Sequence, residues 1–185
     1  TPYLCNPFDH GADIIVHSTT KFLSGHGNAM GGCVVDSGHF DWGKIPNKFP
    51  SLTEPELAYH GLKFYETFGD LTFTLYAHAV GLRDLGPTMA PQNAFLTITG
   101  IETLPLRMEK HCNNAYIIAK WLEQDDRVKS VSYAGLEESD YYSLCQQICP
   151  KGAGSVFTFE LVNSKEGPNV VERRELFSLL ADVGD

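Results

Sequence analysis

The chain has 185 residues, of which 43% are hydrophobic and 20% charged, an ordinary balance for a globular protein of one domain, or of one domain and a part. Lys and Arg number 14 against 23 Asp and Glu, and this net charge of −9 argues against a nucleic-acid-binding surface, because phosphate binding needs clustered cations. The sequence contains no run of about 18 apolar residues, which a membrane span would need. The 5 scattered cysteines are typical of reduced thiols in a cytoplasmic protein.

A polar loop that contains one lysine lies between two predicted strands. The first strand covers residues 12–16, which are apolar on both faces, as expected of a buried parallel strand. The polar run 17–21 follows and ends in Lys21. A glycine-rich turn at residues 25–27 then leads to a second buried strand at residues 33–36.

The middle of the chain is predicted to be a long loop followed by two helices. The density of Gly and Pro marks residues 37–56 as a surface loop. Apolar spacing predicts a helix over residues 73–85 and a second one over residues 94–99, which we expect Gly100 to end.

The longest predicted helix begins near Leu104 and Pro105, because proline suits the first helical turn, where its missing N–H costs nothing. Its apolar stripe comprises Met108, Cys112, Ala115, Ile118, Ala119 and Leu122. Short strands are expected at residues 128–133 and 155–162, and a last helix at about residues 169–180. A composition shift near residues 100–110 indicates a boundary between β-α units and an α+β unit.

Lys21 is the strongest candidate in the sequence for a residue that takes part in a reaction. Burial of a lysine favours the neutral amine, which is the form that makes a Schiff base. Ser18 and Thr20 are two positions apart, so in an extended segment their hydroxyls project to one side. Two hydroxyl donors beside a lysine suit a phosphate group. The same pattern also fits an ordinary strand-to-loop turn with an exposed lysine, and spacing alone leaves that alternative open.

Other motifs predict less. The glycine run at residues 25–31 is neither the dinucleotide fingerprint nor a P-loop, and its glycines more simply let the backbone turn tightly near a ligand. The seven histidines show no metal-binding spacing on a convincing helix. Cys145 and Cys149 are four positions apart, but no second pair completes a zinc site. We therefore expect no metal site.

The stretch of residues 12–27, with its Ser-x-Thr-Lys-x-x-x-Gly-His core, resembles the lysine motif of the pyridoxal-phosphate-dependent Cys/Met-metabolism enzymes, the cystathionine γ-synthase-like family. Residues 1–4 resemble the segment that follows the family's Asp-Asn-Thr, and residues 101–115 resemble its inter-domain helix. Residues 36–69 diverge most. The insert there is similar to that of the O-acetylhomoserine sulfhydrylase branch, as are residues 82–86 and 91–95.

This resemblance implies an α/β fold of the aspartate-aminotransferase type (fold type I). Residues 1–104 would be the C-terminal part of the large cofactor-binding domain, with a mainly parallel sheet. Residues 105–185 would be the N-terminal part of the small α+β domain. Lys21 would hold pyridoxal 5′-phosphate as a Schiff base and later move protons, while Ser18 and Thr20 would bind the phosphate.

The reaction implied by the resemblance is a γ-replacement, in which O-acetyl-L-homoserine and sulfide give L-homocysteine and acetate. A γ-lyase, a cystathionine γ-synthase and a non-catalytic truncated chain remain alternatives. The family also implies a homotetramer of close dimers, with each site shared across an interface. Its aspartate, tyrosine and glycine-rich phosphate loop would precede Thr1, and its carboxylate-binding arginine would follow Asp185. We therefore expect an internal segment of a longer polypeptide.

Overall fold

The computed structural model describes residues 2–173, 175–176, 179 and 183–184. Contacts along the chain divide it into two compact units, each made of separate stretches of sequence. Unit 1 comprises Thr1–Asn6, Thr20–Ala29 and Leu96–Asp185, and unit 2 comprises Pro7–Thr19 and Met30–Phe95.

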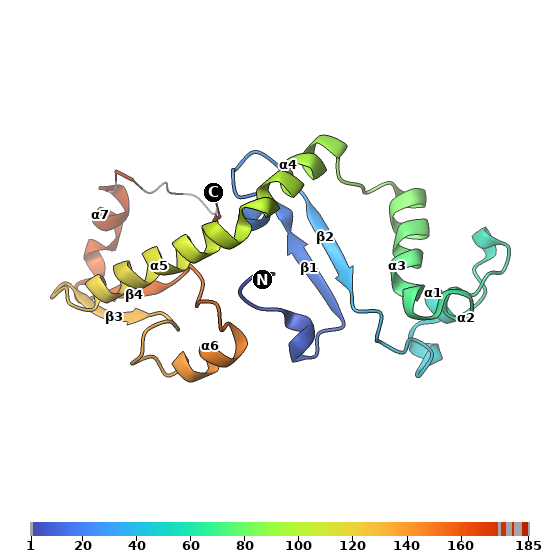
Figure 1. Cartoon of the computed structure of the whole chain (residues 1–185), viewed down its shortest axis with the longest axis horizontal. Coiled ribbons are helices and arrows are strands. Elements are labelled where there is room, and N and C mark those ends of the chain that lie inside the picture. The colour runs from blue at the N-terminus through green and yellow to red at the C-terminus, as the bar shows by residue number, and fades with distance from the viewer. Residues whose placement is uncertain (1, 174, 177–178, 180–182, 185) are drawn as a thin grey trace. The chain divides into compact units, whose positions relative to one another are not determined.

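Unit 2 contains the two strands that flank the lysine loop. Strand β1 (Ile14–Ser18) pairs with β2 (Gly32–Asp36), with Ile14 opposite Asp36 and Ser18 opposite Gly32 (Figure 1). Both predicted strands are confirmed, but the pair is antiparallel, whereas the sequence suggested parallel strands. The connection turns straight back after β1 and contains no crossover helix of the length that parallel neighbours need.

The apolar faces of this strand pair are open within unit 2. The residues Val16 and Val34 are 74% and 56% exposed. The apolar sequence of these strands predicted that they would be buried, but the described residues of unit 2 do not cover them.

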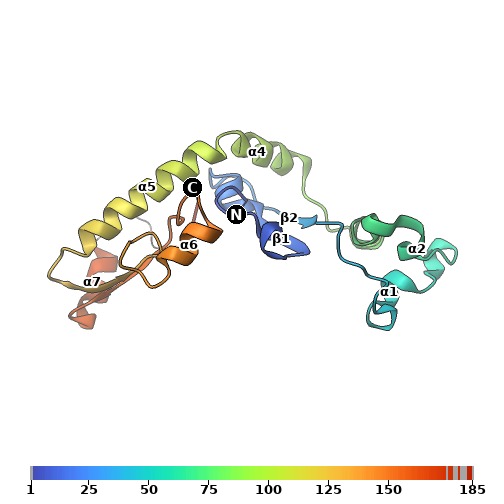
Figure 2. The ribbon, with the colours of Figure 1, turned by 60° about the horizontal axis from the view of Figure 1, so that its bottom comes forward.

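The rest of unit 2 is a series of short helices. They are the 3-10 turns Pro7–His10, Pro46–Lys48, Leu57–Tyr59 and Gly69–Leu71, the helices α1 (Pro50–Thr53), α2 (Phe64–Phe68) and α3 (Thr72–Tyr76), and the π-helical segment Ala77–Asp84 that continues α3. Helices α1 and α2 lie next to each other (Figure 2). The helix predicted over residues 73–85 is confirmed, and α1 lies within the predicted loop.

Phe64 forms the centre of this helical part. Its side chain is 1% exposed, and its ring lies 5.6 Å from Tyr59, 5.7 Å from Phe68 and 5.1 Å from Tyr76, measured between centroids. Aromatic pairs at such distances add to the stabilisation that comes from burial alone.

Helix α4 (Pro91–Glu102) begins in unit 2 and ends in unit 1, and α5 (Leu104–Leu122) follows in unit 1. The start of α5 at Leu104 confirms the prediction. The end predicted for the preceding helix is wrong, because Gly100 lies inside α4 and is buried. A Cβ atom at this position would lie 2.1 Å from the backbone oxygen of Ser24. Gly100 therefore serves close packing rather than termination.

Helix α5 buries one side against two small cores of unit 1. Four members of its predicted stripe are buried, namely Met108, Ala115, Ala119 and Leu122. The first core contains Leu4, Leu23, Leu104 and Met108. The second contains Ala115, Ala119, Tyr133 and Leu136. Ile118 is 38% exposed, so the buried face is narrower than the apolar stripe.

The remainder of unit 1 is α+β. Strand β3 (Val128–Ser132) pairs antiparallel with β4 (Thr158–Leu161), and α6 (Tyr142–Ile148), which was not predicted, lies between them in sequence. The 3-10 turn Ser164–Glu166 and helix α7 (Gly167–Glu172) follow. The helix predicted over residues 169–180 overlaps α7, but its residues 174, 177, 178 and 180 lie outside the described residues.

Candidate functional site

Lys21 lies in a short helical turn directly after β1. The segment Thr19–Leu23 is π-helical, and the backbone departs from helical geometry at Lys21, with φ −88° and ψ −133°. The carbonyl oxygen of Lys21 accepts a hydrogen bond of 2.9 Å from the backbone N–H of Gly25. The lysine is half-buried. The turn thus fixes the point from which the Lys21 side chain starts.

Three consecutive hydroxyl residues precede Lys21, and they differ in exposure. Ser18 ends β1 and is exposed, Thr19 is buried, and Thr20 is half-buried. The expectation that Ser18 and Thr20 project to one side assumed an extended segment. That assumption fails after Ser18, because β1 ends there and Thr20 lies in the turn Thr19–Leu23, where the two-residue alternation of a strand no longer applies.

Thr19 was not singled out by its sequence, but the structure makes it unusual. Its Oγ1 is buried and has no hydrogen-bond partner among the described residues, while its backbone N–H donates to the carbonyl of Gly31 at 2.9 Å. A Cβ atom on Gly31 would lie 2.7 Å from this Oγ1. The missing side chain at Gly31 therefore makes room for this hydroxyl and for the end of the Met89 side chain. A buried hydroxyl without a partner among the described residues is the kind of group that needs an explanation.

Arg107 on α5 is a second residue to which sequence reasoning gave no role. Its Nη1 donates to the carbonyl of Phe22, the residue after Lys21, at 2.9 Å. A faint signal existed in the sequence, since Gly25 lies in the glycine run and a Cβ there would lie 2.1 Å from this Nη1. The glycine makes room for the guanidinium of Arg107.

The side chains at this turn suit a phosphorylated aldehyde. A primary amine at Lys21 can condense with an aldehyde, and hydroxyls at Ser18 and Thr20 can donate to phosphate oxygens. Thr19, which lies between Ser18 and Thr20 in sequence, adds a hydroxyl that has no partner among the described residues. This donor set fits pyridoxal 5′-phosphate chemically.

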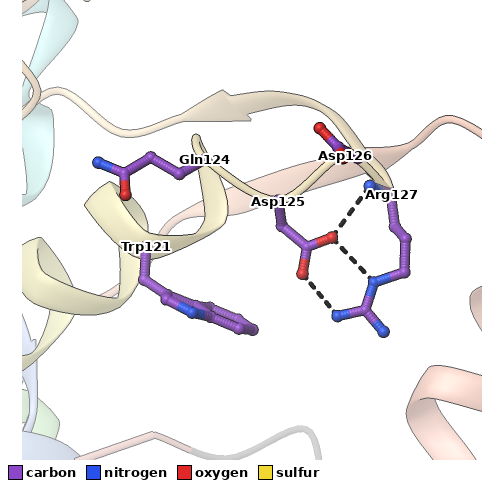
Figure 3. Close-up of a pocket in the computed structure, with 5 residues that line it drawn as sticks. All are labelled: Trp121, Gln124, Asp125, Asp126 and Arg127. Atoms are coloured by element: carbon purple, nitrogen blue, oxygen red, sulfur yellow. Dashed lines mark hydrogen bonds and ion pairs between the residues drawn. The ribbon is translucent and has the colours of Figure 1, made fainter.

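Pockets elsewhere in the chain are lined by other residues. In unit 1 a cavity of about 510 Å³ lies beside the C-terminal end of α5 and is lined by Trp121, Gln124, Asp125, Asp126 and Arg127 (Figure 3). In unit 2 a cavity of about 420 Å³ is lined by Ala58, Tyr59, His60, Leu62, Arg83 and Asp84. Neither lining includes Lys21, Ser18 or Thr20.

The cavity beside α5 contains a tight ion pair. Arg127 donates from its backbone N–H and its Nε to Asp125 Oδ1 at 2.9 and 2.8 Å, and from Nη2 to Oδ2. These bonds lower the pKa of Asp125 to about 2. Asp126 is exposed, but Asp125 is committed to Arg127.

Two further findings concern only the part of the chain that is described. No group of three or more His, Cys, Asp and Glu side chains there is placed to hold a metal ion. None of its helices is both long enough and apolar enough to cross a membrane.

A family model described as "Cys/Met metabolism PLP-dependent enzyme" matches residues 1–185. An O-acetyl-L-homoserine sulfhydrylase from Leptospira meyeri is 45% identical over 195 residues, covering 100% of this chain and 44% of that protein. A homocysteine synthase from Schizosaccharomyces pombe is 46% identical over 187 residues, covering 99% of this chain and 43% of that protein. The chain thus spans less than half the length of these relatives.

Solved structures agree with these matches. One is a Campylobacter jejuni protein described as an O-acetylhomoserine (thiol)-lyase and solved with N′-pyridoxyl-lysine-5′-monophosphate. It superposes with a TM-score of 0.92 at 35% identity, covering 100% of this chain and 44% of that one. A cystathionine γ-synthase from Xanthomonas oryzae gives 0.71 at 30% identity, covering 100% of this chain and 39% of that one. The predicted α/β fold class of type I pyridoxal-phosphate enzymes is confirmed.

Proposed function

The chain belongs to the Cys/Met metabolism PLP-dependent enzyme family, and we propose that it is the part of a longer enzyme that carries the cofactor lysine. The complete enzyme would convert O-acetyl-L-homoserine and sulfide into L-homocysteine and acetate. The observation that carries this proposal is the sequence identity of 45% and 46% to proteins named O-acetyl-L-homoserine sulfhydrylase and homocysteine synthase, which extends over 100% and 99% of this chain.

We assign the cofactor contacts to the turn after β1. Lys21 would bind the aldehyde carbon of pyridoxal 5′-phosphate, and Ser18 and Thr20 would donate to its phosphate. The chemistry of the donor set supports this assignment, as does the position of the turn between β1 and β2. In the same scheme residues 1–104 belong to the large domain and residues 105–185 to the small one, with the boundary next to the start of α5.

The chemical steps proposed for this chain centre on the Lys21 amine. Pyridoxal phosphate, when bound, is an electron sink that stabilises negative charge at the substrate Cα. Once the substrate's own amine has displaced it from the aldehyde carbon, the freed Nζ of Lys21 would remove the α-proton of O-acetyl-L-homoserine and then assist removal of a β-proton. The Cγ–O bond breaks, acetate leaves with its electron pair, and the sulfide sulfur forms the new bond to Cγ. Homocysteine results after the protons return to Cα and Cβ.

A second candidate is a related reaction on the same scaffold. The structural similarity to a solved cystathionine γ-synthase supports this second candidate. The products separate the cases: homocysteine for the sulfhydrylase, cystathionine when cysteine is the nucleophile, and α-ketobutyrate for a γ-lyase.

We further propose a cytoplasmic homotetramer, built as a dimer of close dimers, that acts on amino-acid substrates. The cytoplasmic assignment is supported by the cysteines, since all five are unpaired in the structure. The assembly is inferred from the family resemblance alone, and its mass in solution tests it.

The decisive experiment maps the cofactor lysine in the complete polypeptide. Borohydride reduction followed by peptide mapping should place the pyridoxyl adduct on Lys21, and Lys21→Ala should abolish homocysteine formation while non-covalent cofactor binding persists. Lys44→Ala, at an exposed loop position, is the matched control and should retain turnover. An adduct on Lys44 or Lys63 would refute the assignment.

A further inference from the structure

Arg107 joins the segment that carries Lys21 to the end of α4 through one side chain. Nη1 donates to the carbonyl of Phe22 at 2.9 Å, Nη2 donates to the carbonyl of Gly100 at 2.8 Å, and Nε donates to Oγ1 of Thr103 at 3.1 Å. All of these residues belong to unit 1. Three donors of the planar guanidinium are thus used at once, which fixes its orientation.

The acceptors of Arg107 are uncharged. Burial lowers the pKa of its guanidinium, because fewer water molecules solvate the positive charge there. Gly100 lies in the last turn of α4, where the helix dipole presents partial negative charge that favours a cation. Two backbone carbonyls and the hydroxyl of Thr103 therefore bind the side chain, and none of these partners is a carboxylate.

The backbone around Arg107 is shaped to admit it. Gly25 has φ +64°, and a Cβ there would lie 2.1 Å from Nη1 of Arg107. Ser24, which is fully buried, donates from its Oγ to the carbonyl of Thr20 at 3.1 Å. Two neighbours of Lys21 in sequence, Thr20 and Phe22, thus have their carbonyls held by side-chain donors.

One helical turn further along α5, His111 packs against the same segment. Its ring meets the Phe22 ring edge-on, with centroids 5.5 Å apart and planes at 81°. Burial first, and then the charge of Arg107, lower the pKa of His111. Both effects favour the neutral form of the ring, which gives Phe22 an uncharged surface to pack on.

We propose that Arg107 is the positioning residue for Lys21: by fixing the Phe22 carbonyl it sets the direction of the Lys21 side chain toward the reacting carbon. This inference rests on the proposed role of Lys21 as the cofactor lysine. A displacement of about 1 Å in a catalytic group can reduce a rate by about 100-fold, so loss of the clamp should slow proton transfer by Lys21 about 10- to 100-fold.

The test compares Arg107→Met, Arg107→Lys and Thr103→Val in the complete holoenzyme, with Lys110→Met as the control that removes an exposed charge from the same helix. The readout is deuterium incorporation from solvent at Cα of O-acetyl-L-homoserine, per bound cofactor and without sulfide. Arg107→Met should fall about 10- to 100-fold, Arg107→Lys and Thr103→Val should fall less, and Lys110→Met should match the wild type. KM should change less than about twofold.

A second readout does not depend on turnover. In the cofactor-free protein, Arg107→Met should speed amide hydrogen exchange at residues 22–25, while the amides of β3 keep their wild-type rates. Thr103→Val and Arg107→Lys carry the test if Arg107→Met does not fold. Deuterium incorporation within about twofold of wild type in the folded Arg107 variants, with the borohydride adduct still on Lys21, would overturn the positioning role. An adduct elsewhere in the wild type would instead overturn the proposed function.

Discussion

Replacing Gly100 with alanine tests the close contact between α4 and the segment after Lys21. In an open helical position Gly→Ala stabilises by about 1 kcal/mol, because alanine has the higher helix propensity. At Gly100 the added Cβ would lie 2.1 Å from the oxygen of Ser24 and 2.7 Å from its carbonyl carbon and Cα. These are backbone atoms, so the conflict cannot be relieved by turning a side chain.

The magnitude follows from comparing the two effects. Overpacking a well-filled site costs about 1–3 kcal/mol, and a conflict with backbone atoms belongs at the upper end. Subtracting the gain in helix propensity of about 1 kcal/mol leaves a net destabilisation of about 2 kcal/mol. For a domain of about 150–250 residues, a net loss of about 2 kcal/mol corresponds to a fall in Tm of roughly 4–8 °C.

Thermal unfolding of the complete polypeptide measures the effect, with Gly81→Ala as the matched control. Gly81 also lies in a helical segment, Ala77–Asp84, but a Cβ there would meet no atom of the described residues within 4 Å. Gly81→Ala should therefore leave Tm unchanged or raise it. If Gly100→Ala were as stable as Gly81→Ala, the packing role assigned to Gly100 would be wrong.

Two further predictions concern hydrogen bonds. The double substitution Ser18→Ala/Thr20→Ala should weaken cofactor binding by at least about tenfold, because a hydrogen bond to a charged group contributes about 1.5–3 kcal/mol; unchanged occupancy at limiting pyridoxal phosphate would contradict the phosphate assignment. Tyr133 donates to the carbonyl of Gly154 at 2.8 Å, and burial first, with the nearby thiols of Cys112 and Cys145, raises its pKa to about 12. Because the folded pKa is raised from 10, the contribution of Tyr133 to stability is complete below pH 10 and is lost as pH rises through about 12. Tyr133→Phe should therefore flatten the fall in stability between pH 10 and 12, which urea unfolding across this range measures, and an unchanged slope would contradict the burial argument.

Local signals along the chain are enough to specify several of its elements. Pro105 at the first turn and the apolar stripe locate the start of α5 and its buried face, since both depend only on residues near each other in the chain. β-Branched residues locate β1 and β2 in the same way. The Ser-x-Thr-Lys-x-x-x-Gly-His core points to Lys21 by itself, because a family motif is also a local pattern.

Roles that depend on contacts distant in sequence emerge only in the folded chain. Gly100 reads as a helix end until Ser24 is seen packed against it, and Gly25 reads as a turn residue until the guanidinium of Arg107 occupies the space of its missing side chain. The antiparallel pairing of β1 with β2 likewise depends on how the chain turns between them. In each case the partner lies outside the local window, and the physical reason is the same: close packing is decided by atoms that the fold brings together.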